Sequence, residues 1–242
     1  MTSLTLYAFP TAPGFFNPSP FCNKVEILLK LAGLDFETVM PEDPRGFSKG
    51  KLPVLKDGDE IIEDSEFIRL YLIEKYGATL NGGLSDDSKA VGHAVCRMLD
   101  DRTVHGLAWS RWVEDEGWVQ AKEIFLQGDP DGIGAPMRRE MREGYTFSGF
   151  ARHSTDEQRQ LIKSDIDCLA TLLGDQEWFL ANQPTYLDAT VFSFVANFYA
   201  SPIKTWPIPL VAAHPNLVAY FERGMQRWYP EGSQMLKGIA AE

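Results

Sequence analysis

Ser19-Pro20-Phe21-Cys22-Asn23-Lys24-Val25-Glu26 closes the first loop of this 242-residue chain and opens its first strongly periodic helix. The loop follows Leu4 to Phe9, which alternate in polarity as the residues of a half-buried strand do. At such a helix start, the Ser19 hydroxyl and the Cys22 thiol would lie among unpaired backbone amides, where negative charge is favoured. We therefore look for chemistry at this corner first.

The rest of the first eighty residues alternates strand and helix signals. Apolar residues recur at three- and four-residue spacing from Pro20 to Gly33, which predicts a helix between that proline and that glycine. Asp-Gly between two apolar runs indicates a hairpin. The elements expected after the first helix are a strand, the two hairpin strands and a second helix: Asp35–Met40, Leu52–Lys56, Glu60–Ile62 and Asp64–Tyr76.

Beyond Asn81-Gly82-Gly83 nearly every convincing segment is helical. We expect a long amphipathic helix over Lys89–Glu116 and a last one over Asn216–Trp228. Two capping boxes, at Ser154 and Thr185, each predict the start of a further helix. The sequence thus predicts an α/β domain over 1–80, a linker over 81–87 and an all-helical domain over 88–242.

The charge balance is acidic, with 23 Lys and Arg against 34 Asp and Glu. This balance argues against nucleic acid as a partner, because a nucleic-acid site needs a basic face. The four histidines lack metal-ligand spacing, so we expect no metal: His93, His105, His153 and His214.

Cys22, Cys96 and Cys168 are odd in number and far apart, which indicates a reducing compartment rather than a disulfide framework. The N-terminus enters a strand directly, without the pattern of a signal peptide. No apolar run approaches the length of a membrane span. We expect a cytoplasmic protein without a membrane partner.

Three motifs carry a family resemblance. Ser19-Pro20-Phe21-Cys22 stands where glutaredoxin-like proteins carry Cys-Pro-Tyr-Cys. Gly50-Lys51-Leu52-Pro53 is similar to the cis-proline turn of glutathione transferases, and Glu63-Asp64-Ser65 to the acidic-Ser pair that opens their next helix. In this order the motifs resemble the glutathione S-transferase superfamily, whose fold is a thioredoxin-like glutathione-binding domain followed by an all-helical domain.

The helical half extends the resemblance. Leu172 to Phe192, with its Thr185-x-x-Asp188 box, resembles the C-terminal transferase domain. Together with Pro20 to Glu26, this sequence most resembles the failed-axon-connections and metaxin-like branch of the superfamily. The resemblance covers nearly the whole chain and is weakest over Gln127–Gly149, where glycine-rich turns are expected to interrupt the helices.

The resemblance implies a glutathione site on the first domain. The backbone of Leu52, before Pro53, would pair with the cysteinyl backbone of glutathione. Ser65 and the following helix start would bind the γ-glutamyl carboxylate, and Asp64 would face the ammonium group. Lys51 would meet the glycyl carboxylate or simply be solvated.

Ser19 is the main candidate for catalysis. Its hydroxyl would donate a hydrogen bond to the glutathione thiolate, and lowering a thiol pKa by about two units needs roughly 2.7 kcal/mol. A serine before Pro20 is also an ordinary N-cap, a role compatible with catalysis. Cys22, at the resolving position of the glutaredoxin pattern, is the second candidate or a small packed residue.

The function implied is a glutathione transferase that activates the glutathione thiol for attack on a small electrophile. The family usually forms homodimers, which we carry over as an expectation. Two alternatives stay open: a binding, adaptor or transport protein without turnover, as in the metaxin-like branch, or a thiol transferase based on Cys22. The long loop Pro10–Pro18 would either cover the site with Phe15 and Phe16 or turn Ser19 away from it.

Overall fold

The computed structural model describes residues 4–11, 15–130 and 132–239. Its first part is a four-stranded sheet flanked by two helices, with strand order β2-β1-β3-β4. β1 is parallel to β2 and antiparallel to β3, which is antiparallel to β4. The elements are β1 (Leu4–Tyr7), α1 (Pro20–Leu31), β2 (Phe36–Val39), a 3-10 turn (Pro44–Gly46), β3 (Val54–Asp57), β4 (Glu60–Glu63) and α2 (Ser65–Tyr76). This order confirms the predicted thioredoxin-like plan.

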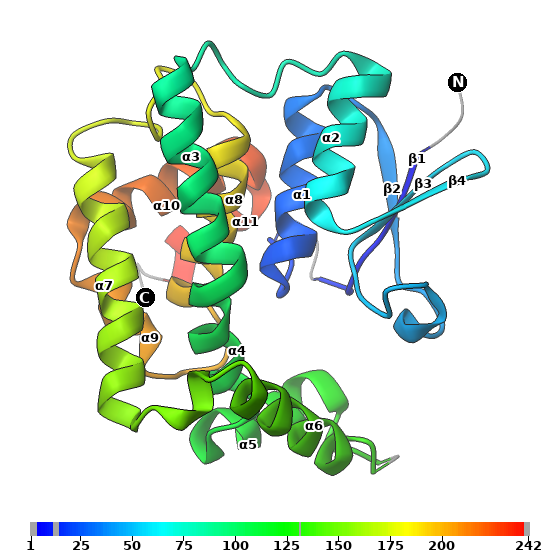
Figure 1. Cartoon of the computed structure of the whole chain (residues 1–242), viewed down its shortest axis with the longest axis vertical. Helices are drawn as coiled ribbons and strands as arrows, with labels where there is room; N and C mark the ends of the chain where they lie inside the picture. Colours follow the sequence, from blue (N-terminus) through cyan, green and yellow to red (C-terminus); the bar gives the residue numbers. More distant parts are fainter. Residues whose placement is uncertain (1–3, 12–14, 131, 240–242) are drawn as a thin grey trace.

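Local chemistry sets the ends of the two helices that face the helical half. α1 begins at Pro20 after the N-cap Ser19, and the backbone reverses at Gly33, where φ is +67°. α2 begins after the N-cap Asp64 and ends at Gly77 in the left-handed conformation that glycine adopts without a steric penalty. In Figure 1, α1 and α2 lie between the sheet and the remaining helices.

The second part of the chain is helical, and no strand is assigned there among the described residues. Its helices are α3 (Asp86–Met98), the π-helical segment η2 (Leu99–Thr103), α4 (Val104–Trp112), α5 (Asp115–Leu126), α6 (Gly134–Phe147), the 3-10 turn η3 (Phe150–Arg152), α7 (Thr155–Leu173), α8 (Tyr186–Tyr199), α9 (Pro207–Ala212), α10 (Pro215–Trp228) and α11 (Pro230–Ile239). The segment 77–85, which the predicted linker overlaps, contains neither helix nor strand.

The single helix expected over Lys89–Glu116 was wrong at its C-terminal end. Helical structure stops at Trp112, and α5 begins three residues later. The chain folds back there because α5 packs closely on α4: a Cβ at Gly117 would lie 1.8 Å from the Ser110 carbonyl oxygen. The turn carries one apolar residue, Val113, followed by Glu114, Asp115 and Glu116, and acidic residues are compatible with a helix that continues.

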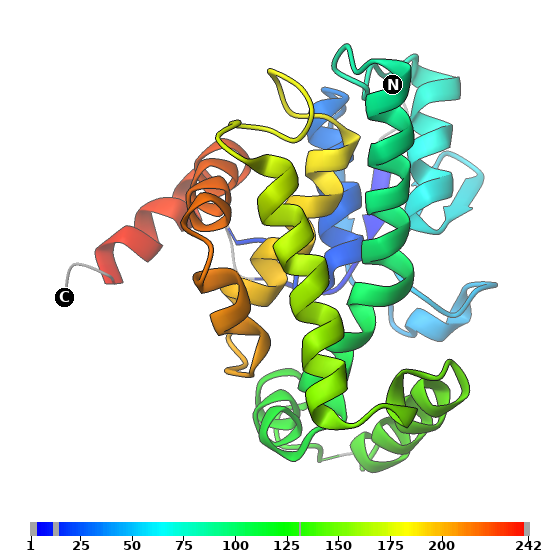
Figure 2. The ribbon, with the colours of Figure 1, turned by 60° about the vertical axis from the view of Figure 1, so that its left-hand side comes forward.

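Over Gln127–Gly149 the expected glycine turns are present on both sides of one helix, at Gly128 and Gly132 before it and at Gly149 after it. Residues 127–149 contain one continuous helix, α6, and Gly144 lies inside it. Figures 1 and 2 place α5 and α6 together at one end of the helical bundle, below α4 and the start of α7. Both predicted capping boxes are confirmed, at the starts of α7 and α8.

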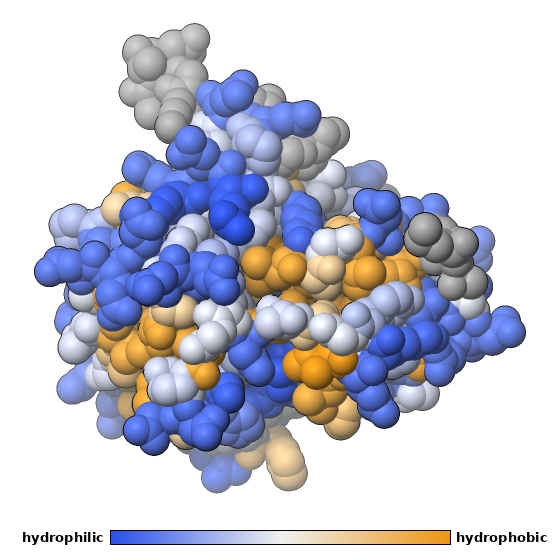
Figure 3. All heavy atoms as spheres, turned by 90° about the horizontal axis from the view of Figure 1, so that it is seen from above, coloured by the Kyte–Doolittle hydropathy of each residue, from blue (hydrophilic) through white to orange (hydrophobic). Residues whose placement is uncertain are grey.

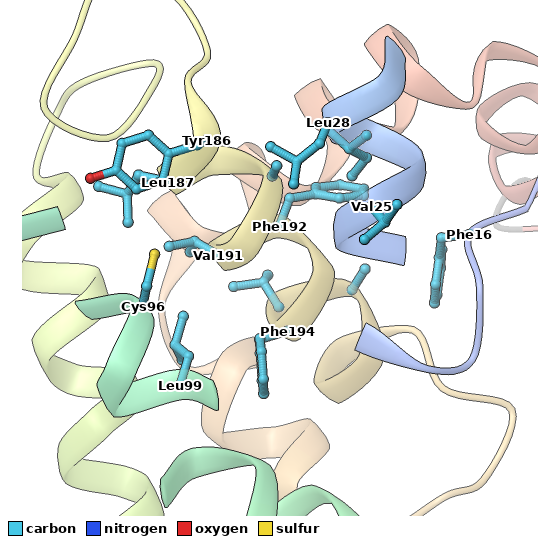
Figure 4. Close-up of a cluster of buried hydrophobic side chains, with 14 of the residues drawn as sticks. Phe16, Val25, Leu28, Cys96, Leu99, Tyr186, Leu187, Val191, Phe192 and Phe194 are labelled. Atoms are coloured by element: carbon cyan, nitrogen blue, oxygen red, sulfur yellow. The ribbon is translucent and has the colours of Figure 1, made fainter. Parts of the chain in front are cut away.

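One hydrophobic core runs through both parts of the chain. α1 packs on α8, and Figure 4 shows Val25 and Leu28 of α1 beside Phe192 of α8, with Leu99 and Cys96 on the other side. Every labelled residue of that cluster is less than a tenth exposed. Among the described helices, none combines the length and apolarity needed to span a lipid bilayer.

Candidate active site

The register of the sheet brings the three predicted motifs to one end of it. Tyr7, the last residue of β1, pairs with Val54 at the start of β3, and Val54 pairs with Glu63 at the end of β4. The loop that leads to Ser19 leaves β1 at that end, Pro53 precedes β3 there, and the acidic-Ser pair follows β4 there. Because β3 is antiparallel to β1 and β4, motifs that are distant in the sequence lie at the same end of the sheet.

Ser19 is half-buried and caps α1. Its Oγ accepts a hydrogen bond from the Cys22 backbone N–H at 3.4 Å, and its own N–H donates to Asn17 Oδ1 at 3.0 Å. A hydroxyl that accepts from the backbone still has its hydrogen to donate. Capping therefore leaves Ser19 able to hydrogen-bond a thiolate.

Cys22 lies one turn inside α1 and is fully buried. Burial raises the pKa of its thiol to about 11, although a hydrogen bond with Ser19 acts in the opposite direction. A thiol must ionise and be accessible to act as a nucleophile. The environment of Cys22 is that of a packed core residue.

The turn before β3 is held by a carboxylate from β4. Glu63 accepts hydrogen bonds from the backbone N–H groups of Ser48 and Lys49, at 3.0 and 2.7 Å. The Leu52-Pro53 peptide bond that follows is cis, and both residues are buried. Lys51, just before them, is exposed.

Asp64 and Ser65 form the start of α2. Asp64 has a positive φ of 86°, uncommon for a residue with a side chain, and its Oδ1 accepts from the Glu66 N–H at 2.9 Å. Ser65 is the first residue of the helix and is buried. The structure thus places both predicted residues at a helix N-terminus, a location suited to a carboxylate ligand.

A set of buried polar side chains that sequence reasoning missed supports the loop before Ser19. Asn17 Nδ2 donates to the Phe9 carbonyl at 2.7 Å, which ties the two ends of the loop together. Asn23 Oδ1 accepts from the Asn17 N–H at 3.3 Å, and Asn23 Nδ2 donates to Ser193 Oγ on α8 at 3.0 Å. Asn23 lies in the motif that opens α1, but nothing in its spacing predicts these contacts.

The helical part contributes the rest of this support. Asn197 of α8 donates to the Asn17 carbonyl at 3.0 Å, and Arg111 of α4 donates to the Pro18 carbonyl at 2.9 Å. The ring of Phe16 packs edge-on against Phe221 of α10, which holds this part of the loop against the helical bundle. Positions 12–14 of the predicted loop lie outside the described residues.

Two shallow surface hollows lie away from the motifs. One is lined by the linker glycines and the turn before α8, the other by the end of α1 and the start of β2. The first has no ionisable side chain in its lining. The second is lined by Lys30 and Asp35, but none of the three motifs contributes a residue to either hollow.

No group of three or more His, Cys, Asp or Glu side chains is arranged for a metal ion within the described part of the chain. The candidate site consists instead of the hydroxyls of Ser19 and Ser65, two helix N-termini and the cis-proline turn. Such groups suit an anionic, peptide-like ligand.

Comparison with known families gives two matches in chain order. Residues 20–117 match the glutathione S-transferase N-terminal domain, and residues 162–224 match the glutathione S-transferase C-terminal domain. The first match includes the cis-proline turn and the start of α2, and the second includes the capping box of α8.

Three proteins illustrate the range of relatives to which this chain is similar. The isoprene-epoxide–glutathione S-transferase of Rhodococcus sp. (strain AD45) is 29% identical over 91% of this chain and 97% of its own length. Failed axon connections of Drosophila melanogaster is 25% identical over 95% of this chain, which spans only 59% of that longer protein. Metaxin-2 of Mus musculus is 22% identical over 86% of this chain and 81% of its own length.

Solved structures agree in fold. A glutathione S-transferase III in apo form superposes with a TM-score of 0.62 at 20% identity, over 95% of this chain and 96% of that one. A glutathione S-transferase from Rhodospirillum rubrum F11 gives 0.59 at 19% identity, over 90% and 86%. With both domain types matched in order and the fold in agreement, the chain belongs to the glutathione S-transferase superfamily and has failed-axon-connections and metaxin proteins among its relatives.

Proposed function

We propose that the protein is a glutathione transferase that activates the thiol of glutathione at Ser19. Ser19 donates its hydroxyl hydrogen to the sulfur, and the N-terminus of α1 favours the negative charge of the thiolate. The hydroxyl acts as a hydrogen-bond donor and forms no covalent bond. The observation that carries the proposal is the convergence of three glutathione-type motifs at one end of the sheet.

The remaining motif residues bind the tripeptide in this proposal. The Leu52 backbone pairs with the cysteinyl residue, while Ser65 and the amides of α2 receive the γ-glutamyl carboxylate. Asp64 is exposed beside them and meets the ammonium group. Lys51 is exposed at the same end of the sheet and pairs with the glycyl carboxylate.

The electrophile proposed for first testing is a small epoxide. The support is the name of the 29% identical relative, which covers nearly the whole of both chains. In the reaction, the thiolate sulfur forms a bond to an epoxide carbon while the carbon–oxygen bond breaks. The thiol released its proton to water when it ionised, and the resulting alkoxide takes one back from water. The reaction therefore gives a single product, which carries a thioether and a neighbouring hydroxyl group.

Paired cap variants test the role of Ser19. Ser19→Ala removes both the cap and the hydroxyl, so we expect about 1 kcal/mol of lost stability and about a 100-fold lower kcat/KM with glutathione and an epoxide. Ser154→Ala is the matched control, because Ser154 caps α7 through the same kind of Oγ to backbone bond. It should lose similar stability and keep full activity. Equal activity in both variants would reduce Ser19 to a cap.

The second candidate is a glutathione-binding or adaptor protein without turnover. It is supported by failed-axon-connections and metaxin relatives, whose names carry no enzymatic activity. Calorimetric titration with glutathione separates the two functions. Heat of binding without turnover on a panel of epoxides and other electrophiles supports the second candidate, and no heat at all excludes both as glutathione proteins. A thiol transferase based on Cys22 is disfavoured by the burial of that thiol.

We further propose a homodimer in the cytoplasm. Large apolar side chains are exposed on α2 and α3: Phe67 at 58%, Leu70 at 45% and Val91 at 42%. Apolar surface is also visible on the face seen from above in Figure 3. Light scattering after size exclusion should give twice the 27.2 kDa mass of one chain. The Phe67→Glu variant should give the mass of a single chain.

A further inference from the structure

Arg111, near the end of α4, is a buried cation beside the candidate site. Only 5% of the residue is exposed. Its Nη1 donates to the Pro18 carbonyl at 2.9 Å, and its Nη2 donates to the carbonyl and Oδ1 of Asn197 at 2.5 and 3.1 Å. All of its acceptors are neutral oxygens.

The charge of Arg111 has no acidic partner among the described residues. No carboxylate lies within 4 Å of its guanidinium, and its Nε is buried without a hydrogen-bond acceptor. The other deeply buried cation, Lys24, contrasts with it, because Lys24 Nζ contacts Asp100 Oδ2 at 2.9 Å. Burial alone lowers the pKa of Arg111 to about 9. A buried and uncompensated charge is costly to a fold, so its presence calls for an anion.

One contact of Arg111 is with the peptide bond that precedes Ser19. The Pro18 carbonyl is part of the peptide bond whose nitrogen belongs to Ser19, and that N–H donates to Asn17. The titratable groups that face this corner from α1 and from the segment after α10 are Cys22, Glu26 and Tyr229. Of these only Glu26 is ordinarily ionised at neutral pH, and it is paired with Lys30 at 2.8 Å. Glu114, three residues after Arg111, accepts from Trp206 Nε1 at 2.8 Å and makes no ion pair with the guanidinium, so the charge of Arg111 stays unbalanced.

We propose that Arg111 is a positioning residue of this site, which fixes the Pro18–Ser19 peptide and supplies the positive charge that favours a thiolate at Ser19. The inference rests on the proposed function for its ligand, the glutathione thiolate. Its physical content, a cation acting on position 19, does not depend on glutathione and is tested without it.

The test places a thiol at position 19 with Ser19→Cys and measures its pKa from the rate of iodoacetamide alkylation against pH. Cys168→Ser removes the exposed thiol from the background, and the buried Cys22 and Cys96 react slowly. With Arg111 present, the new thiol should ionise well below the ordinary value of about 8.5. Arg111→Met and Arg111→Gln should each raise that pKa by about 1 or more, and Arg111→Lys should restore most of the decrease.

Arg138→Met is the matched control. Arg138, on α6, also donates to a backbone carbonyl at the end of α4, that of Val113 at 2.7 Å, but it has Asp115 as a partner. Its loss should leave the thiol pKa unchanged. An ordinary pKa with Arg111 present, no increase in the neutral variants, or an equal increase in Arg138→Met would overturn the proposal. If both neutral variants unfold, a thiol pKa in Arg111→Lys equal to that with Arg111 supports it, and an ordinary value overturns it.

Glutathione titration of the unmodified protein keeps the two proposals apart. Absence of glutathione binding together with a low, Arg111-dependent thiol pKa would remove the proposed function and keep the anion-favouring corner. Binding and turnover, together with a thiol pKa that does not change when Arg111 is replaced, would keep the proposed function and remove the proposed role of Arg111. Thermal midpoints of all variants identify losses that come from unfolding alone.

Discussion

Two reactive groups stand three residues apart at the start of α1, and their surroundings separate their roles. Ser19 is partly accessible at the cap, whereas Cys22 faces the core that α1 shares with α8. The sequence alone does not tell which of the two groups is accessible. Which one faces solvent depends on the loop before them and on the helices that pack behind α1.

The burial of Cys22 predicts a resistant thiol. With a pKa of about 11, the thiol is almost entirely protonated at about pH 8, and it is also shielded from reagents. Iodoacetamide should therefore label the exposed Cys168 and spare Cys22 in the folded protein, as read by peptide mass spectrometry. Protein unfolded in guanidinium should be labelled at both positions. Equal labelling in the folded state would show that α1 opens readily and would revive Cys22 as a candidate.

At the scale of single residues, motif positions were predictable and their supports were not. Ser19, Pro53 and Ser65 were identified because their types and order match a family pattern. Asn17, Arg111 and Asn197 were not, since a polar residue in a sequence is normally assigned to the surface. Their burial follows from contacts between segments about 90 to 180 residues apart, which no local pattern contains.

Among the elements, the two capping boxes have the same pattern and very different surroundings. The box of α7, Ser154 with Glu157, is exposed, whereas the box of α8, Thr185 with Asp188, is fully buried. The Asp188 carboxylate also accepts from the Phe179 N–H at 2.9 Å and from the Tyr220 hydroxyl at 3.3 Å. It thus joins the turn before α8 to α10 as well as starting its own helix.

This difference predicts unequal effects of the same change. Asp188→Ala leaves several buried donors without an acceptor and should lower the free energy of unfolding by about 3 kcal/mol or more. Glu157→Ala exposes its donors to water and should change stability little. Urea unfolding followed by circular dichroism measures both. Similar midpoints for the two variants would mean that water reaches the start of α8 in the folded protein.

Helix limits were predicted well where local chemistry marks them: α2 ends at Tyr76, before Gly77, as predicted, whereas the end of α4 was missed. Caps at Ser19, Ser154 and Thr185 signal a start within a few residues. The end of α4 has no such signal, because α5 reverses on a contact between Gly117 and the Ser110 carbonyl that only the tertiary structure reveals. The helix α6 was missed because glycine is a weak helix former, and no local signal shows that Gly144 lies inside a helix.

Across the whole molecule, α1 ties the sheet to the helical bundle by charge as well as by apolar packing. Lys24 of α1 is 1% exposed and contacts Asp100 of η2, which also accepts from Arg97 at 2.6 Å. Asp100 Oδ1 is buried without a partner, and burial raises the pKa of this carboxyl despite the nearby cations. The Lys24–Asp100 pair therefore joins the two halves of the chain, and loss of either charge leaves the other buried with less compensation.

Removal of Lys24 tests that balance. Lys24→Met leaves Asp100 buried with less compensation, so we expect about 3 kcal/mol of lost stability near neutral pH. The pKa of Asp100 should rise further in the variant. A carboxyl whose folded pKa exceeds its unfolded value contributes stability in acid and loses it as pH rises through the folded pKa. The deficit of Lys24→Met should therefore be small near pH 4.5 and grow toward pH 7.5, as measured by urea midpoints at both values.

Two further variants make this result specific to the joint between the halves. Lys163→Met removes an exposed cation that is paired with Asp167 in one helix, and its midpoint should hardly move at either pH. Adding Asp100→Leu to Lys24→Met removes the stranded charge and should recover at least half of the loss while abolishing its pH dependence. A deficit that stays constant with pH, or that the second change deepens, would mean that Lys24 acts through packing rather than through its charge.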